Sequence, residues 1–265
     1  MRAGLIRSAD FRRLADLAYK HFGIYLPEKK RQLITNKFSN TLTRRGYENW
    51  GAYIDDIEND SSGRLLLEFA DRLTTNHTYF FREEDHFSAL RDRILVKFMP
   101  KGSRIDGADL RIWCAGCATG EEAYTLAITL FEHRGGDEPF HLPPILATDI
   151  SFSALKKAKE GLYDSERLQN MPKKLMKRHF RETYPGSATV KDHLRSAILF
   201  KRLNFMTETF PFKKKFHAVF CRNVMIYFDD ASKGGLISRL TDSLEPGGLL
   251  FIGHSETISH EHLGD

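Results

Sequence analysis

Apolar residues recur every three to four positions over roughly the first 70 residues, which is the spacing of one-sided helices. Phe11, Leu14 and Ala18 mark a first helix that Gly23 ends, because glycine readily takes the left-handed conformation that stops a helix. A second helix runs from about residue 28 to Gly46, and two more follow it. The pattern predicts a small helical bundle without a sheet.

The pattern changes after residue 100, where short apolar runs alternate with helical stripes. The runs typical of buried strands are 111–115, 145–150, 216–221 and 249–253. This alternation predicts an α/β fold, a Rossmann-like parallel sheet with helices on both faces. Between about 162 and 200 the alternation stops. Turn residues and short β-prone runs, including 196–202, predict a small inserted antiparallel β subdomain there.

We therefore expect a helical domain at 1–72, a linker at 73–86 and an α/β domain at 87–265. The linker places three consecutive aromatic residues, 79–81, beside side chains that form hydrogen bonds. Such a run is either a packed interdomain hinge or a lining for a cofactor cleft. In the second case Arg82 offers a fixed cation to a carboxylate.

A glycine-containing turn follows the first strand and opens a helix at residue 121. Gly116 and Gly120 let the backbone approach a ligand, but the third glycine of the dinucleotide fingerprint is missing. Glu121 and Glu122 occupy the first helical turn, where a phosphate would otherwise rest. They suit a cationic ligand such as S-adenosylmethionine, or they merely complement the helix dipole. The residues alone leave both interpretations open.

Asp149 ends the second strand, the position that binds ribose hydroxyls in a Rossmann-like sheet. The same residue type also caps helices, and a helix follows from Ser151. The two roles are compatible. Asp149 is therefore a candidate for the ribose of a nucleoside cofactor.

Composition narrows the class of protein. The 265 residues carry 40 basic and 35 acidic side chains, and a net charge of +5 is too small to require a nucleic-acid partner. No apolar run is long enough to span a membrane and no signal peptide is visible at the start, so we expect no membrane insertion. Three cysteines favour reduced thiols and a cytoplasmic protein.

A zinc site is the alternative use of these cysteines. Cys114, Cys117, Cys221 and His254 would supply the ligands. No second cysteine pair exists, so buried thiols are favoured and we expect no metal.

Five motifs then occur in one order. They are Leu73–Arg82, Thr119–Glu122, Ala147–Asp149, Cys221–Phe228 and Gly248–Glu256. Together they resemble the CheR family of chemoreceptor glutamate methyltransferases, over almost the whole chain. The resemblance implies that S-adenosylmethionine donates a methyl group to glutamates on the cytoplasmic helices of chemoreceptors, leaving S-adenosylhomocysteine.

The resemblance also implies roles for single residues. The cofactor-binding residues it implies are Asn76, Thr78, Arg82, Gly116, Glu121, Asp149, Asn204, Arg222 and Asn223. Arg82 and Tyr227 would be the catalytic groups closest to the transferred methyl. Since a glutamate carboxylate is already ionised at neutral pH, we expect these two residues to orient it rather than to ionise it.

Basic residues of the second helix are candidates for binding the receptor. Lys30, Lys37 and Arg44 recur every seven residues, a pattern that is either a solvated face or a docking surface. If the substrate is an acidic receptor helix, these basic side chains have a partner of opposite charge, which favours the docking interpretation. In some members of the family the inserted β region binds a peptide at the receptor's C-terminus, which this sequence neither requires nor excludes.

Two other functions compete. Lys213–Lys215 and the basic run of the insertion suggest a nucleic-acid methyltransferase, whose binding would weaken steeply with salt. A non-catalytic S-adenosylmethionine sensor or receptor scaffold is the second. Members of the family typically continue through a last short strand, whereas this sequence ends at Asp265. Either the sequence is truncated or the final hairpin is missing, and in both cases we expect a sheet edge without its neighbour.

Overall fold

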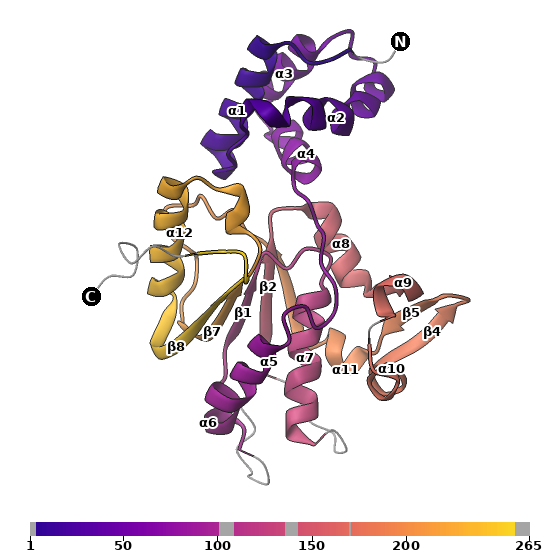
Figure 1. Cartoon of the computed structure of the whole chain (residues 1–265), viewed down its shortest axis with the longest axis vertical. Coiled ribbons are helices and arrows are strands. Elements are labelled where there is room, and N and C mark those ends of the chain that lie inside the picture. Colours follow the sequence, from indigo (N-terminus) through magenta and orange to yellow (C-terminus); the bar gives the residue numbers. More distant parts are fainter. Residues whose placement is uncertain (1–3, 101–108, 136–142, 170, 258–265) are drawn as a thin grey trace. The chain divides into compact units, whose positions relative to one another are not determined.

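The computed structural model describes residues 4–100, 109–135, 143–169 and 171–257 (Figure 1). It divides into two compact units. The first comprises the chain up to Thr75 together with Asn204–Glu208 and Tyr227–Gly234, and the second comprises the remainder.

The first unit is helical. Its elements are α1 (Ser8–Phe22), a 3-10 turn η1 (Glu28–Lys30), α2 (Arg31–Arg45), α3 (Trp50–Asn59) and α4 (Arg64–Leu73). Gly23 and Gly46 end α1 and α2 in the left-handed conformation, as predicted. Phe38 is fully buried against Phe69, with ring centroids 5.5 Å apart. An isolated bridge between Ile24 and Phe228 joins the 227–234 segment to this unit.

The second unit is built on a parallel sheet in the order β6-β2-β1-β7-β8. The strands are β1 (Ile112–Ala115), β2 (Ile145–Asp149), β6 (Ile198–Arg202), β7 (Phe216–Cys221) and β8 (Leu244–Ile252). Before the sheet comes one continuous helical stretch made of α5 (Asp85–Leu90), the π-helical η2 (Arg91–Leu95) and α6 (Val96–Phe98). In Figure 1 the five strands run side by side, with α7 (Glu121–Arg134), α8 (Phe152–Glu160) and α12 (Asp230–Asp242) beside them. The predicted Rossmann-like fold is confirmed.

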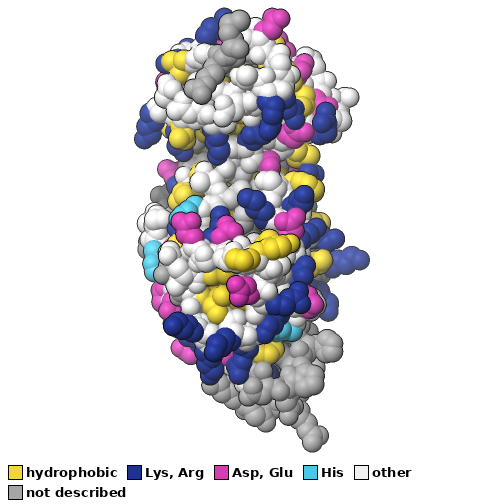
Figure 2. Space-filling view, turned by 90° about the vertical axis from the view of Figure 1, so that its right-hand side faces the viewer, with side chains coloured by type: hydrophobic (Ala, Val, Ile, Leu, Met, Phe, Trp, Pro, Cys, Tyr) yellow, Lys and Arg dark blue, Asp and Glu magenta, His cyan; other side chains and the backbone are white. Residues whose placement is uncertain are grey.

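The inserted segment forms a second, smaller sheet in the order β3-β5-β4. Its elements are β3 (Leu162–Asp164), α9 (Ser165–Leu168), α10 (Lys173–His179), β4 (Phe180–Tyr184), β5 (Ser187–Val190) and α11 (Asp192–Arg195). The strands pair antiparallel, as predicted. Figure 2 views the molecule from the side of this sheet and shows lysine and arginine side chains beside an apolar patch.

Two local predictions were wrong. The run at 196–202 was assigned to the insertion, but it forms β6 and pairs in parallel with β2 in the main sheet. The last strand was predicted at 249–253, but β8 begins at Leu244 and runs through Pro246–Gly248 with an irregularity. Phe216 pairs with Leu244 and Ala218 with Leu249. Strand propensity marks such a run without saying which sheet it joins.

The centre of the main sheet is fully covered. Every residue of β1 is buried, and the indole Nε1 of Trp113 donates a hydrogen bond to Thr148 Oγ1 over 2.9 Å. Because β1, β2 and β7 are parallel, their carboxyl ends meet at one edge, where such folds place their ligands. No helix in the described ranges is long and apolar enough to cross a membrane.

Candidate functional site

The turn after β1 is held against the end of β2. The backbone N–H groups of Gly116 and Cys117 both donate to Thr148 O, over 2.8 and 2.9 Å. Gly120 has φ +97°, and a Cβ there would lie 2.8 Å from the Cβ of Ala158. The turn therefore needs glycine for its backbone conformation and for its packing against α8.

Asp149 organises this turn from the end of β2. Its Oδ2 accepts a hydrogen bond from Ala118 N, and its Oδ1 accepts one from Ser151 N, both over 2.8 Å. Ser151 in turn caps α8, because its Oγ accepts from Ala154 N over 3.1 Å. The linker reaches the same place, since Asn76 Nδ2 donates to Ser151 Oγ at 3.5 Å. Asp149, Asn76 and the turn are thus brought together at the ligand edge.

Glu121 points into the protein rather than into solvent. Its side chain is fully buried, accepts a 2.6 Å hydrogen bond from Thr119 Oγ1 and forms an ion pair with Arg167 of α9. This pair joins the inserted subdomain to the turn. Glu121 therefore shapes the turn through contacts that are already satisfied.

Arg222, at the end of β7, is the centre of a buried charge network. Its fully buried guanidinium pairs with Glu122 over 2.8 Å and with Glu83 over 3.1 Å, and it donates to Arg82 O. Burial raises the pKa of Glu122, although the charge of Arg222 opposes the shift. Burial acts in the same direction on Glu83, but there the hydrogen bond and charge of Arg222 prevail and lower the pKa. The network fixes the linker to the sheet.

Glu256 fastens the loop after β7. Its carboxylate accepts hydrogen bonds from the backbone N–H groups of Asn223, Met225 and Gly253, each over 2.7 Å. Asn223 has φ +59°, and its side chain lies against Gly253 so closely that a Cβ there would collide with it. The Cys221–Phe228 and Gly248–Glu256 motifs are therefore two halves of one structure.

Backbone strain gathers in the same segments. Among the described residues, those other than glycine with positive φ are Phe81, Glu83, Ala118 and Asn223, at +58°, +55°, +46° and +59°. Each lies in or next to one of the five motifs that resemble the family. Non-glycine residues held in this conformation cost free energy and cluster at functional sites.

Two further predicted residues lie on the linker. Arg82 is one quarter exposed, donates to His77 O over 3.3 Å and stacks over the ring of Tyr79 at 5.6 Å. Thr78 is half-buried. Their assignment to the cofactor, and that of Gly116, Glu121, Asp149, Arg222 and Asn223, stays a prediction.

The first unit holds the two remaining residues that were predicted to bind the cofactor or to catalyse, Asn204 and Tyr227. Tyr227 donates its hydroxyl to Thr75 O over 3.5 Å, and Lys30 lies 5.9 Å from its ring. Asn204 Nδ2 donates to His21 O over 2.7 Å. The roles assigned to Tyr227 and Asn204 also stay predictions.

The basic stripe is not uniform. Arg44 is exposed, Lys30 is half-buried in η1, and Lys37 turns inward. The Lys37 ammonium donates to Leu73 O and Thr74 O, over 3.0 and 2.8 Å, and burial lowers its pKa. Lys37 thus binds the C-terminal end of α4, whereas the predicted docking of a receptor helix needs an exposed cation at this position. Docking stays a prediction for all three.

The three cysteines are buried free thiols. Burial raises the pKa of each well above its usual range, and the Cys114 thiol contacts Glu122 Oε1 at 3.2 Å. A thiol held protonated in this way is a poor metal ligand. The structure thus agrees with buried thiols.

Three residues that hold the site together, Glu83, Arg167 and Glu256, were assigned no role from the sequence, and Glu122 was assigned a ligand or the helix dipole rather than Arg222. Glu122 and Glu256 stood within the motifs, but the partner of a buried carboxylate is far away in sequence. Glu256 binds Asn223, 33 residues earlier, and Glu122 binds Arg222, 100 residues later. Motif spacing carries no signal for these pairs.

Family models match both parts of the chain. Residues 9–74 match the CheR methyltransferase all-alpha domain, and residues 76–264 match the CheR methyltransferase SAM binding domain. The chain belongs to the CheR methyltransferase family. S-adenosylmethionine, the predicted cofactor, is the ligand of this family domain.

Curated relatives align with this chain over nearly its full length. A chemotaxis protein methyltransferase of Borreliella burgdorferi is 42% identical over 96% of this chain and 89% of its own. One of Escherichia coli K12 is 36% identical over 96% of this chain and 86% of its own. The chain is therefore similar to chemotaxis protein methyltransferases along both of its family domains.

Solved structures give only a distant likeness. The glycopeptide N-methyltransferase MtfA complexed with S-adenosylmethionine has a TM-score of 0.32 and 16% identity, covering 54% of this chain and 43% of its own. PKMT2 from Rickettsia typhi has a TM-score of 0.39 and 13% identity, covering 67% and 26%. Neither likeness bears on the activity.

The residues at the edge of the sheet fit S-adenosylmethionine. A Cβ at Gly116 would collide with Val224 and one at Gly120 with Ala158, so only glycine lets the turn take this conformation at the end of β1. Asp149 is 8% exposed and ends β2, where a Rossmann-like sheet places the carboxylate that binds ribose hydroxyls. Glu121 and Glu122 at the start of α7 are already paired with Arg167 and Arg222, so they shape the turn, and Asp149 is the acidic residue that the turn offers to a nucleoside.

Proposed function

We propose that the chain transfers the methyl group of S-adenosylmethionine to glutamate side-chain carboxylates on the cytoplasmic helices of chemoreceptors, and that it acts in the cytoplasm. The observation that carries this proposal is the match of both CheR family domains, over 9–74 and 76–264. The products are glutamate methyl esters and S-adenosylhomocysteine.

The residues of the second unit divide the work of binding the cofactor. Asp149 binds the ribose, while Asn76, Thr78 and Arg82 hold the methionine end. Glu121 and Arg222 are fully buried and already paired, so they act by fixing the turn and the Asn223 loop. In the first unit, Asn204 serves the adenine.

Little acid–base chemistry is asked of the protein. S-adenosylmethionine supplies an electrophilic methyl group on a sulfonium centre when it is bound. The acceptor carboxylate is ionised at neutral pH and needs no general base. Arg82 and Tyr227 orient it, and strong pairing with a cation would stabilise the reactants more than the transition state, in which charge disappears. The protein's contribution is position and the exclusion of water.

The activity is tested by transfer of labelled methyl from S-adenosylmethionine to chemoreceptor cytoplasmic fragments. We expect label that mild base releases as methanol and that disappears when the acceptor glutamates are changed to alanine. Base-stable label, or none on a receptor while the cofactor still binds, would contradict glutamate methylation.

Residue roles need matched variants. Asp149→Asn should weaken cofactor binding at least 10-fold by calorimetry, because a charge-assisted bond to ribose is lost, while the exposed Glu160→Gln should not. Tyr227→Phe should lower kcat at saturating substrate. An unchanged kcat would remove Tyr227 from the mechanism.

Receptor docking is assigned to the charges of exposed Arg44 and half-buried Lys30. Lys30→Gln with Arg44→Gln should raise KM for the receptor fragment with little change in kcat, whereas Lys20→Gln, an exposed change on α1, should not. Equal effects of the two changes would point to general charge rather than to this helix.

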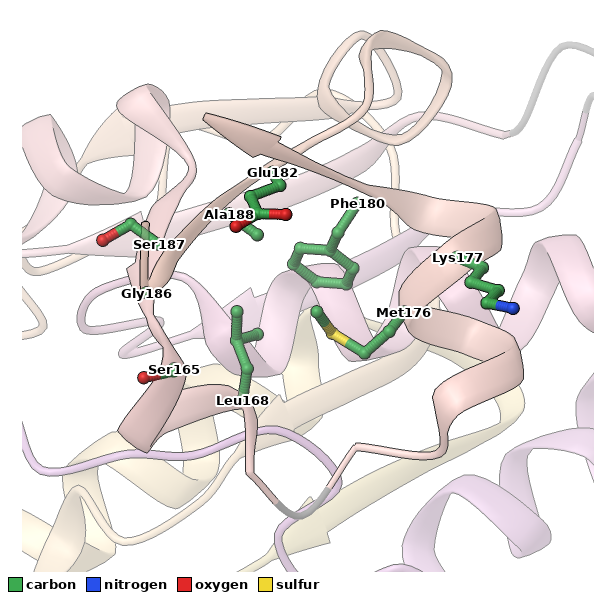
Figure 3. A pocket seen from close by; sticks show the side chains of 9 residues that line it. All are labelled: Ser165, Leu168, Met176, Lys177, Phe180, Glu182, Gly186, Ser187 and Ala188. Carbon is green, nitrogen blue, oxygen red and sulfur yellow. The ribbon is translucent and has the colours of Figure 1, made fainter. Parts of the chain in front are cut away.

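The inserted subdomain supplies a second receptor contact in this proposal. A cavity of about 490 Å³ lies among α9, α10, β4 and β5. Figure 3 shows Leu168, Met176 and Phe180 converging in it. Such a floor suits an apolar side chain of the receptor's C-terminal peptide. Fluorescence titration with that peptide should show binding that Met176→Lys abolishes and Lys173→Gln leaves intact; equal binding by both variants would remove the peptide from the proposal.

A further inference from the structure

Three side chains with metal-binding atoms meet in the second unit. Glu83, His86 and His254 each offer one ligand atom, and these atoms all lie within 4.8 Å of one another. Asp85 adds a carboxylate whose Oδ2 is 3.1 Å from His254 Nε2. Glu83, Asp85 and His86 come from the turn that opens α5, and His254 directly follows β8.

The Nδ1 atom of His86 is the feature that points to a ligand. It is buried and has no hydrogen-bond partner among the residues that the structure describes. Glu83 Oε2 is 3.6 Å away, beyond hydrogen-bond length. The ring is placed by packing, 5.0 Å from the His254 ring and 5.7 Å from that of Phe251. Buried polar atoms normally have a partner, so this one calls for an explanation.

The group has a closed floor and an open side. The side chains of Glu83 and His86 are 12% and 15% exposed, whereas those of His254 and Asp85 are 56% and 65% exposed. Ligands of a tetrahedral zinc ion, about 2.1 Å from the metal, lie about 3.4 Å apart. The ligand atoms of Glu83, His86 and His254 lie within 4.8 Å of one another, so the mostly exposed His254 would move toward the floor when an ion enters from solvent.

The neighbouring Arg222 does not prevent cation binding. Its charge is shared by Glu83 and Glu122, and Asp85 adds a further negative charge on the open side. Glu83 Oε2 accepts from Arg222 Nη2 and from His254 N, whereas Oε1 lies 3.8 Å from Arg82 Nε, beyond hydrogen-bond length. The oxygen that faces His86 is Oε2, and a carboxylate oxygen has more than one acceptor site, so a metal at Oε2 would compete with the bond from Arg222 and with the charges of Arg82 and Arg222.

We propose that Glu83, Asp85, His86 and His254 bind one zinc ion. Two imidazoles with carboxylates suit zinc, whereas calcium and magnesium require more oxygen ligands. The ion would tie the turn before α5 to the end of β8. This site departs from the sequence-based expectation of no metal, uses none of the cysteines and does not depend on the proposed function.

The test uses the untagged full chain, freed of metal with a chelator. Zinc chloride is titrated in competition with a chromophoric chelator, and cobalt chloride is added separately to read the visible absorption of the bound ion. We expect one zinc per chain and an intense cobalt spectrum of tetrahedral type. His86→Ala and His254→Asn should each weaken zinc binding at least 100-fold, because each removes a ligand, while His21→Asn in the first unit should leave it unchanged.

Circular dichroism and the Tm of the metal-free variants separate loss of a ligand from loss of the fold. His254→Asn changes a mostly exposed side chain, so it keeps the test decisive if His86→Ala unfolds. Zinc affinity in His254→Asn equal to that of the parent would overturn the proposal. So would the absence of a stoichiometric zinc equivalent in the parent, or a loss in His21→Asn as large as in His254→Asn.

Discussion

Changing Glu256 to alanine should open the loop after β7. The carboxylate accepts three backbone N–H groups, those of Asn223, Met225 and Gly253, and the residue is 8% exposed. A hydrogen bond to a charged group contributes about 1.5–3 kcal/mol, and an unsatisfied buried donor costs about 1–3 kcal/mol. Allowing for water that reaches the opened loop, the loss should be about 3–6 kcal/mol, a large part of the 5–15 kcal/mol typical of a domain.

Amide hydrogen exchange measures this loss where it occurs. Exchange at Asn223, Met225 and Gly253 should accelerate by about 100-fold or more in Glu256→Ala, since about 3 kcal/mol corresponds to roughly that ratio. Amides of β1 should change less unless the whole unit unfolds. Glu256→Gln should fall between, because its amide offers one acceptor oxygen where the carboxylate offers two. The exposed Glu160→Ala serves as control.

Exchange rates give a free energy of opening for each of these three amides. The reasoning is refuted if that free energy in Glu256→Ala differs from the parent's by less than about 0.5 kcal/mol, the usual range of a neutral surface change. That outcome would mean that other contacts hold the loop. A loss of cofactor binding without faster exchange would also count against a structural role for Glu256.

Three other changes test the buried contacts. Arg222→Met should destabilise the second unit by about 3–5 kcal/mol in urea unfolding, because it leaves buried Glu122 without its cation. Adding Glu122→Gln should recover part of this loss. No recovery would contradict the pairing of Arg222 with Glu122. Gly120→Ala should cost at least about 1 kcal/mol and weaken cofactor binding, because φ is +97° and a Cβ would press on Ala158; full stability and binding would refute this. Burial lowers the folded-state pKa of His179 and His193, so the unfolded chain takes up protons first as the pH falls. The free energy of unfolding should therefore decrease as the pH drops below about 6.5. The double change His179→Asn with His193→Asn should weaken this pH dependence, and an unchanged pH dependence would contradict the assignment.

Much of the fold could be predicted because it depends on local pattern. The apolar runs marked β1, β2 and β7, and glycine marked the ends of α1 and α2. The sheet to which 198–202 belongs could not be predicted, because that is decided by pairing with β2, about 50 residues earlier. Propensity describes a strand but does not name its neighbour.

The site shows the same division between local and distant information. The motifs indicated where ligand-binding backbone would lie, and Asp149 does meet the glycine turn. Lys37 shows the limit, since its seven-residue spacing from Lys30 and Arg44 gave no sign that its ammonium binds the end of α4. Charge spacing defines a helix face, but packing decides which charges on it remain exposed.

The place of β1 in the sheet also affects how the chain is made. On one side it pairs with β2, about 33 residues later, and on the other with β7, about 106 residues later. A ribosome therefore releases the central strand long before its second neighbour exists. During that interval the backbone N–H and C=O groups along one edge of β1 have no strand to pair with and can pair wrongly, and folding waits for a contact of long sequence separation. A chaperone that shields exposed strands during this interval should therefore raise the yield of folded protein.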